Sequence, residues 1–153
     1  MKTADRTRKN GIMPTVVVPI LLMVVVVTGG CTVGTEEVPA GVSQTIEDIT
    51  VQEAAEMIEE RWGDADFAII DVRTPEEFTE GHIEGAVLVN FRDDDFRDKV
   101  GELDRDKTHL IYCRSGARSA GARDVMAELG FREIYNMSDG ILGWEAARHP
   151  VVQ

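Results

Sequence analysis

A cysteine followed by serine, glycine and arginine residues is the part of this sequence best suited to chemistry. The segment is Cys113-Arg114-Ser115-Gly116-Ala117-Arg118-Ser119. The apolar residues before it, Leu110 to Tyr112, predict a buried strand, and the helical spacing after it predicts a helix that ends at Gly130. A thiol at such a junction faces backbone N–H groups and the positive end of a helix, which favour a thiolate and an anionic substrate beside it.

An alternative is that Cys113 is an inert, buried thiol at the end of a strand. An inert thiol is expected in apolar surroundings, but the six residues after Cys113 include a glycine, two serines and two arginines. The sequence therefore favours a reactive Cys113, with Arg114 and Arg118 as the groups that attract an anion.

This loop and three further motifs resemble the rhodanese family of sulfurtransferases, in particular its small single-domain members. The resemblance spans about Ile46 to Val152, and its motifs are Asp71-Val72-Arg73, the run Glu80 to Ala86, the loop Cys113 to Ser119 and the run Gly140 to Trp144. Related phosphatases and arsenate reductases have a loop that is one residue longer. Here four residues separate Cys113 from Arg118, which matches the shorter sulfurtransferase loop.

The resemblance implies an α/β fold with a central parallel sheet of about five strands, flanked by helices on both faces. It also implies transfer of a sulfane sulfur from an anionic, thiosulfate-like donor to cyanide, a thiol or a protein acceptor. The sulfur passes through a persulfide on Cys113, and no cofactor is expected. Two alternatives stay open: a persulfide carrier or docking module with little turnover, and arsenate reductase or phosphatase chemistry, against which the loop length speaks.

Other residues with reactive side chains are assigned to the scaffold. Asp71 and Arg73 could act as an acid and a base, but attack by a thiolate needs no strong base, so we expect them to support the loop. His82 could pair with the cysteine, but its setting between Gly81 and Ile83 favours a turn. The three histidines are scattered, with no Cys or acid at ligand spacing, so no metal site is predicted.

The charge distribution excludes nucleic acid as a partner. The 153-residue chain has a net charge of −12, of which +3 lies in the first 35 residues, so the remainder carries −15.

The length allows one domain with a short appendage, and a monomer is expected. Two cysteines, Cys31 and Cys113, provide no disulfide framework.

Residues 1–30 are typical of a targeting segment, with basic residues before an apolar run from Ile12 to Val27. As a helix, this run spans about 24 Å, less than the roughly 30 Å hydrocarbon core of a membrane. The sequence Thr28-Gly29-Gly30-Cys31 resembles a lipoprotein cleavage box with Cys31 as the lipidated residue, although Thr28 departs from the usual leucine. An uncleaved membrane anchor is the alternative, and both place the domain outside the cytoplasmic membrane.

Secondary structure is predicted to alternate between strands and helices. Residues 31–45 are small and polar, which indicates a flexible tether before a domain over residues 46–153. Strands are predicted at 67–70, 87–89, 107–112 and 133–136, and helices after Thr50, after Thr74, from Asn90 to about Val100, after the reactive loop and over 141–148. Strands and helices at this spacing favour parallel βαβ units.

Overall fold

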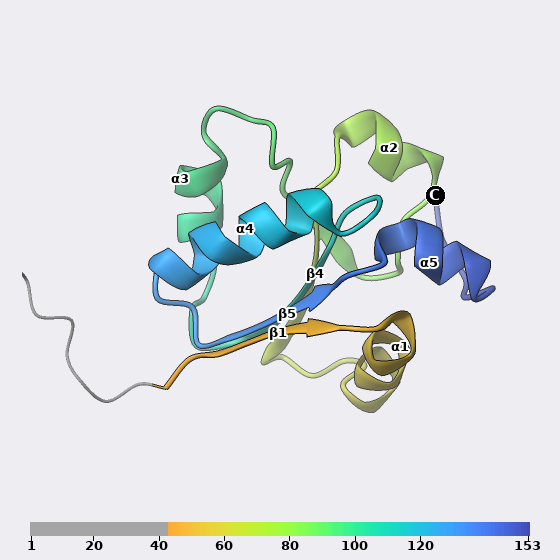
Figure 1. Ribbon diagram of the computed structural model, residues 1–153, viewed down its shortest axis with the longest axis horizontal. Helices are drawn as coiled ribbons and strands as arrows, with labels where there is room; N and C mark the ends of the chain where they lie inside the picture. The colour runs from red at the N-terminus through yellow and green to blue at the C-terminus, as the bar shows by residue number, and fades with distance from the viewer. Residues whose placement is uncertain (1–42) are drawn as a thin grey trace, which may run out of the picture. The chain divides into compact units, whose positions relative to one another are not determined.

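The computed structural model describes residues 43–153 (Figure 1). Cys31 and the predicted targeting segment therefore lie outside the described residues. Within residues 43–153, no helix has the length and apolar character needed to cross a membrane. The elements in chain order are β1 (Thr45–Ile49), α1 (Val51–Glu60), β2 (Phe67–Asp71), α2 (Pro75–Glu80), β3 (Ala86–Leu88), α3 (Phe96–Gly101), β4 (Thr108–Tyr112), α4 (Ala117–Glu128), β5 (Glu133–Met137) and α5 (Gly140–Ala146).

The strands form one parallel sheet in the order β1-β5-β4-β2-β3. Strand β4 lies at its centre, and all five of its residues are buried, the polar Thr108 and His109 included, as expected for a strand covered on both faces. The α/β fold with a five-stranded parallel sheet agrees with the architecture predicted from the sequence. In such a sheet, ligands bind beyond the carboxyl ends of the strands.

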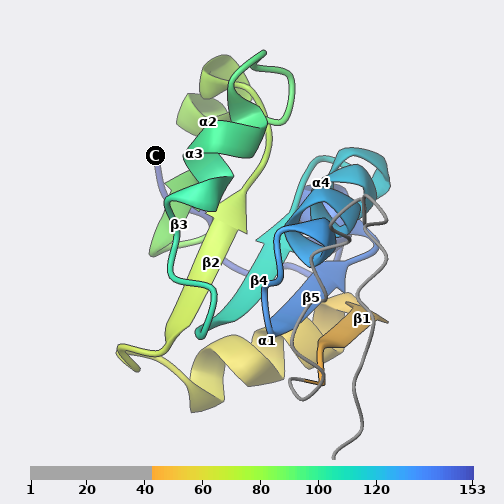
Figure 2. The ribbon, with the colours of Figure 1, turned by 90° about the vertical axis from the view of Figure 1, so that its left-hand side faces the viewer.

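Helices cover both faces of the sheet (Figure 2). On one face, α3 and α4 pack against Ile70 and Ile111, and Cys113 belongs to this cluster. On the other face, α1 and α5 pack against Ile69, Leu110 and Tyr112. Because successive side chains of a strand point to opposite faces, the position of Cys113 two residues after Ile111 directs its thiol towards α4.

Two helices begin where their sequences predict. Thr50 accepts a hydrogen bond from the Glu53 N–H, and the Glu53 carboxylate accepts one from the Thr50 N–H, which completes a capping box at α1. Thr74 and Glu77 form the same arrangement at α2, with Pro75 at the first helical position. These local signals set the residues at which α1 and α2 begin.

The predicted helix from Asn90 to Val100 is wrong in its first half. The Asn90 side chain accepts a hydrogen bond from the Arg92 N–H and donates one to Asp93, which closes a turn, and α3 begins only at Phe96. Strand β1 is an element that the sequence did not predict. It lies at the edge of the sheet and is largely exposed, so it lacks the continuous apolar run of a central strand.

Candidate active site

The cysteine loop lies at the carboxyl end of β4, where Cys113 directly follows the strand and α4 begins at Ala117. Gly116 ends the loop with a φ of +87°, and a Cβ at this position would collide with the carbonyl oxygen of Ser138. Only glycine combines this left-handed backbone with so close an approach. The sharp turn from strand to helix therefore depends on Gly116.

The N-terminus of α5 contacts the same loop. The Ile141 N–H donates to the Cys113 carbonyl at 2.9 Å, and the Leu142 N–H donates to the Arg114 carbonyl at 3.1 Å. A Cβ on Gly140 would lie 2.5 Å from the carbonyl carbon of Arg114, so α5 approaches the loop backbone closely. These contacts fix the backbone that surrounds the thiol, and they give a physical role to the motif from Gly140 to Trp144.

The Cys113 thiol lies in a polar cradle although only 1% of the residue is exposed. Burial acts to raise the pKa of the thiol. Hydrogen bonds from the Ser119 hydroxyl and from the N–H groups of Ser119, Ser115 and Arg118 outweigh burial and lower the pKa below its ordinary value. Such an environment favours the thiolate form of a cysteine over the thiol.

The Ser119 hydroxyl links the thiol to the loop backbone. Its oxygen lies 3.5 Å from Cys113 Sγ and 3.0 Å from the carbonyl oxygen of Gly116. Because a hydroxyl has one hydrogen, Ser119 donates to the sulfur or to the carbonyl, but not fully to both. Ionisation of the thiol strengthens the bond to sulfur, since hydrogen bonds to charged acceptors are stronger.

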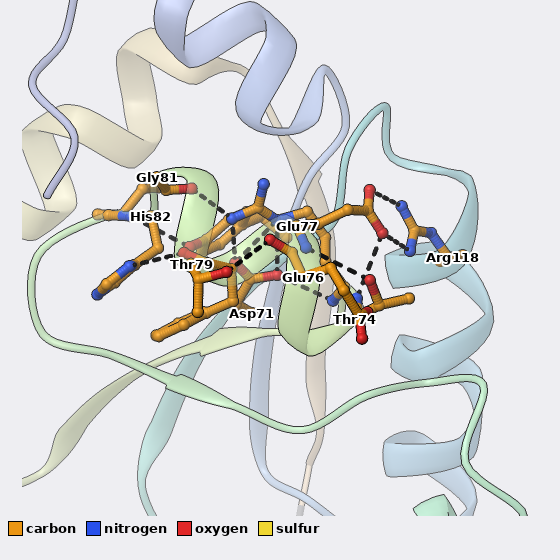
Figure 3. Close-up of polar contacts among 12 residues, drawn as sticks. Asp71, Thr74, Glu76, Glu77, Thr79, Gly81, His82 and Arg118 are labelled. Atoms are coloured by element: carbon orange, nitrogen blue, oxygen red, sulfur yellow. Dashed lines mark hydrogen bonds and ion pairs between the residues drawn. The ribbon is translucent and has the colours of Figure 1, made fainter. Parts of the chain in front are cut away.

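The two arginines of the loop differ in their contacts. The Arg118 guanidinium donates to both carboxylate oxygens of Glu77, each at 2.7 Å (Figure 3). This pairing lowers the pKa of Glu77 to about 2 and raises that of Arg118. Arg114 is exposed, and no ion pair is found for it within residues 43–153. Arg114 is therefore the guanidinium of the loop that is available to an incoming anion.

Asp71 and Arg73 form a buried ion pair at the end of β2. Arg73 donates to both carboxylate oxygens, with a shortest distance of 2.6 Å, and also to the Gly81 carbonyl at 2.7 Å. The Arg73 guanidinium carbon lies 5.7 Å from the ring centroid of Tyr112, the residue before Cys113. The pair thus connects β2, the end of α2 and the end of β4, which suits a supporting role.

The histidines of the domain make packing contacts. His82 Nδ1 lies 3.1 Å from the Phe78 carbonyl oxygen, and its ring stacks on that of Phe78. His109 is buried in β4, where burial lowers its pKa, and His149 packs against Trp144. Across the part of the chain that the structure describes, no cluster of three His, Cys, Asp or Glu side chains could hold a metal ion.

Glu77 and the backbone of α5 are the parts of this site that sequence reasoning missed. In the sequence, Glu77 is only an acid in the first turn of α2, because its partner Arg118 lies 41 positions away. The glycines at 140 and 143 were a signal for close packing near α5, but the sequence does not tell which backbone they approach. The Glu77–Arg118 pair and the contact of α5 with the loop both arise where separate elements meet at the carboxyl end of the sheet.

Comparison with known proteins agrees with this geometry. The profile of the Rhodanese family, described as a rhodanese-like domain, matches residues 50–147. A sulfurtransferase of Allochromatium vinosum is 35% identical over 101 residues, which cover 64% of this chain and 91% of that protein. The thiosulfate sulfurtransferase GlpE of Pseudoalteromonas translucida is 32% identical over 100 residues, which cover 65% of this chain and 89% of that protein.

Solved structures show the same fold. A rhodanese-related protein from Thermoplasma volcanium superimposes with a TM-score of 0.58 at 28% identity, over 71% of this chain and 97% of that one. A rhodanese-like domain protein from Staphylococcus aureus gives a TM-score of 0.55 at 26% identity, over 64% and 90%. Since the family profile covers most of the described residues and these structures share the sheet, the chain belongs to the rhodanese-like sulfurtransferase family.

Proposed function

We propose that this protein transfers a sulfane sulfur from an anionic donor of the thiosulfate type to a thiophilic acceptor through a persulfide on Cys113. The observation that carries the proposal is the place of the Cys113 thiol between β4 and the start of α4, where the Ser119 hydroxyl lies 3.5 Å from the sulfur and hydrogen bonds from the loop hold the pKa of the thiol below its ordinary value. Thiosulfate sulfurtransferases among the relatives support the choice of donor. The protein is expected to act as a monomer and without a cofactor.

The first step loads the enzyme. The Cys113 thiolate attacks the outer sulfur of thiosulfate, a new S–S bond forms, and the original S–S bond breaks with its electron pair leaving on sulfite. Arg114 is exposed and unpaired within the described domain, so we assign it to the sulfonate end of the donor. The positive charge of Arg118 is compensated by Glu77, and this ion pair attaches the first turn of α4 to α2. The backbone N–H groups of Arg118 and Ser119 in this turn face the sulfur.

The second step unloads the enzyme. A nucleophile attacks the outer sulfur of the persulfide, and the electron pair of the broken bond returns to Cys113 as a thiolate. Cyanide gives thiocyanate, and a thiolate gives a new persulfide. The same N–H groups that stabilise the resting thiolate stabilise the charge that develops on Sγ in this step, without rearrangement of the loop.

Mass spectrometry after treatment with thiosulfate tests the proposal. We expect an adduct of about 32 Da, one sulfur atom, on the wild-type protein and none on Cys113→Ser. Continuous thiocyanate production with cyanide indicates an enzyme, whereas a single loading indicates a carrier. A Cys113 that stays unmodified contradicts the proposal, and release of phosphate from p-nitrophenyl phosphate would point to phosphatase chemistry instead.

We also propose that the domain works outside the cytoplasmic membrane, held there by its N-terminal segment. The support is the basic and apolar pattern of residues 1–30 and the small residues before Cys31. Incorporation of a labelled fatty acid into the wild-type protein, and its loss in Cys31→Ala, would identify a lipoprotein. Membrane association without a label would identify the uncleaved anchor, and a wild-type protein found entirely in the cytosolic fraction contradicts both.

A further inference from the structure

Residues 149–153, which we call the strap, connect α5 to the end of α2. Val152 pairs with His82 in an antiparallel bridge, in which each backbone N–H donates to the carbonyl of the other residue at 2.9 Å. The Gln153 side chain donates to the Glu80 carbonyl at 3.3 Å, and the C-terminus accordingly lies beside the end of α2 in Figure 1. The strap therefore joins two helices that lie far apart in the sequence.

The other end of the strap is attached to α5. The indole N–H of Trp144 donates to the Pro150 carbonyl at 2.8 Å, and the rings of Trp144 and His149 lie with their centroids 4.4 Å apart. Between α5 and the strap, Arg148 has a φ of +63°, and it is the only non-glycine residue within 43–153 with a positive φ. This conformation is unfavourable for a residue with a side chain and persists only where the surrounding contacts hold the chain. The backbone at Arg148 thus indicates that the strap is held firmly at both ends.

The two helices that the strap joins are also bound to the region around the thiol. The first N–H groups of α5 donate to the carbonyls of Cys113 and Arg114. At the end of α2, the carbonyl of Gly81, the neighbour of His82, accepts a hydrogen bond of 2.7 Å from Arg73. Arg73 follows β2, which pairs with β4, the strand that leads to the thiol. The strap therefore closes a ring of contacts that includes the cysteine loop, α5 and the end of α2.

Helix α5 depends on its surroundings for its position. It has seven residues, of which Gly140, Ile141 and Trp144 are buried. A helix of two turns is not stable in isolation, so tertiary contacts decide where it lies. Besides the packing of Ile141 and Trp144 against the sheet, α5 is held by the cysteine loop at its start and by the strap at its end. Loss of the strap removes one of these attachments.

We propose that the strap is a positioning element for the sulfur transfer proposed above: the bridge between Val152 and His82 holds α5 where its N–H groups fix the backbone of the cysteine loop. The inference rests on the proposed function and adds to it residues that do not touch the sulfur. When the bridge is broken, α5 is free to shift, and the carbonyls of Cys113 and Arg114 shift with it. The N–H groups that face the thiol then align less well, so the thiolate is less stabilised and persulfide forms more slowly.

Two variants that detach the strap from opposite ends test the inference. Val152→Pro removes the N–H that donates to the His82 carbonyl, and Trp144→Phe removes the indole donor to the Pro150 carbonyl but keeps an aromatic ring. In each variant, we expect the pH midpoint of alkylation by iodoacetamide to rise. The rate of persulfide formation from thiosulfate at neutral pH should fall about three- to tenfold, the equivalent of about one hydrogen bond. Mass spectrometry follows both reactions.

Two control variants separate positioning from stability. Val152→Ala keeps the backbone bridge, and Gly130→Ala strains a left-handed backbone beyond the far end of α4, so both should retain the wild-type midpoint and rate. Equal values in Val152→Pro and Val152→Ala, or an equally large change in Gly130→Ala, would overturn the inference and leave the proposed function standing. A wild-type protein that cannot be loaded would instead overturn the proposed function, while the alkylation midpoints still decide the role of the strap.

Discussion

Glu77 and Arg118 join α2 to the first turn of α4 through two hydrogen bonds of 2.7 Å each. The same Glu77 carboxylate accepts a hydrogen bond from the Thr74 N–H at 3.3 Å and so completes the cap of α2. One carboxylate therefore holds the start of α2 and, through Arg118, the helical turn whose N–H faces Cys113. The pair also decides how much positive charge the loop offers to a donor.

Replacing Glu77 by Gln is expected to free the Arg118 guanidinium for an anion. The KM for thiosulfate should then fall by about three- to fivefold, the effect of one partly exposed ion pair. Arg118→Ala should instead raise the KM, since it removes a cation and the link to α2. Steady-state kinetics measure both effects, with Glu76→Gln as the control that changes neither. A KM that is the same in all three variants would exclude an electrostatic role for Arg118.

The same ion pair predicts how acid affects stability. The pKa of Glu77 is about 2 in the folded protein, compared with an ordinary value of 4.5. The free energy that this ionised carboxylate contributes to folding is therefore fully present above pH 4.5 and is lost as the pH falls towards 2. We expect Glu77→Gln to lower the free energy of unfolding by about 1–2 kcal/mol at neutral pH, after allowance for solvent screening. Urea titrations at several pH values should show this difference vanish near pH 2. A difference that is independent of pH would contradict the assignment.

The pH profile of thiol alkylation tests the cradle around Cys113. Because hydrogen bonds lower the pKa of the thiol, the rate of reaction with iodoacetamide should reach half its maximum below the ordinary value of 9.0. Ser119→Ala removes the hydroxyl donor and should move this midpoint to higher pH. Ser115→Ala is a matched control, because Ser115 contributes its N–H and keeps it. Equal midpoints in both variants would show that the Ser119 hydroxyl does not tune the thiol.

Two glycines with the same backbone conformation allow the energetic cost of a strained backbone to be distinguished from the cost of a steric collision. Gly116 and Gly130 have φ values of +87° and +84°, but only Gly116 lies against another backbone group, the Ser138 carbonyl. Gly130→Ala should cost about 1–2 kcal/mol from its left-handed conformation. Gly116→Ala should cost about 1–3 kcal/mol more and abolish persulfide formation, since the loop must shift. Thermal unfolding and mass spectrometry measure the two effects, and equal losses would argue against the collision.

The buried pair of Asp71 and Arg73 should be costly to break. Asp71→Asn leaves the Arg73 charge buried without a counter-charge, and we expect the free energy of unfolding to fall by about 3–5 kcal/mol. Asp48→Asn, at an ion pair whose aspartate side chain is 52% exposed, should cost less than about 1 kcal/mol. Urea denaturation compares the two variants. Similar losses in both would indicate that Asp71 is not a structural support.

Much of the fold could be predicted because its signals are local. The capping boxes at Thr50 and Thr74 place both partners within four residues, so the sequence shows them directly. The segment after Asn90 was misread because a single side chain can cap a helix or close a turn, and only the packing of Phe96 and Val100 decides which occurs. Strand β1 was not predicted because its sequence lacks an apolar run. As an edge strand, it is formed mainly through its pairing with β5, which the sequence does not show.

The sequence by itself determined the alternation of strands and helices, the short loop from Cys113 to Ser119 and its place between a strand and a helix. Only the tertiary structure decided that Glu77 compensates Arg118, that α5 holds the carbonyls of Cys113 and Arg114, and that Arg114 remains available. The physical reason is the order of the sheet. Because β4 lies between β2 and β5, the segments that follow these three strands meet at the carboxyl end of the sheet. Contacts between residues so far apart in the chain leave no local pattern in the sequence.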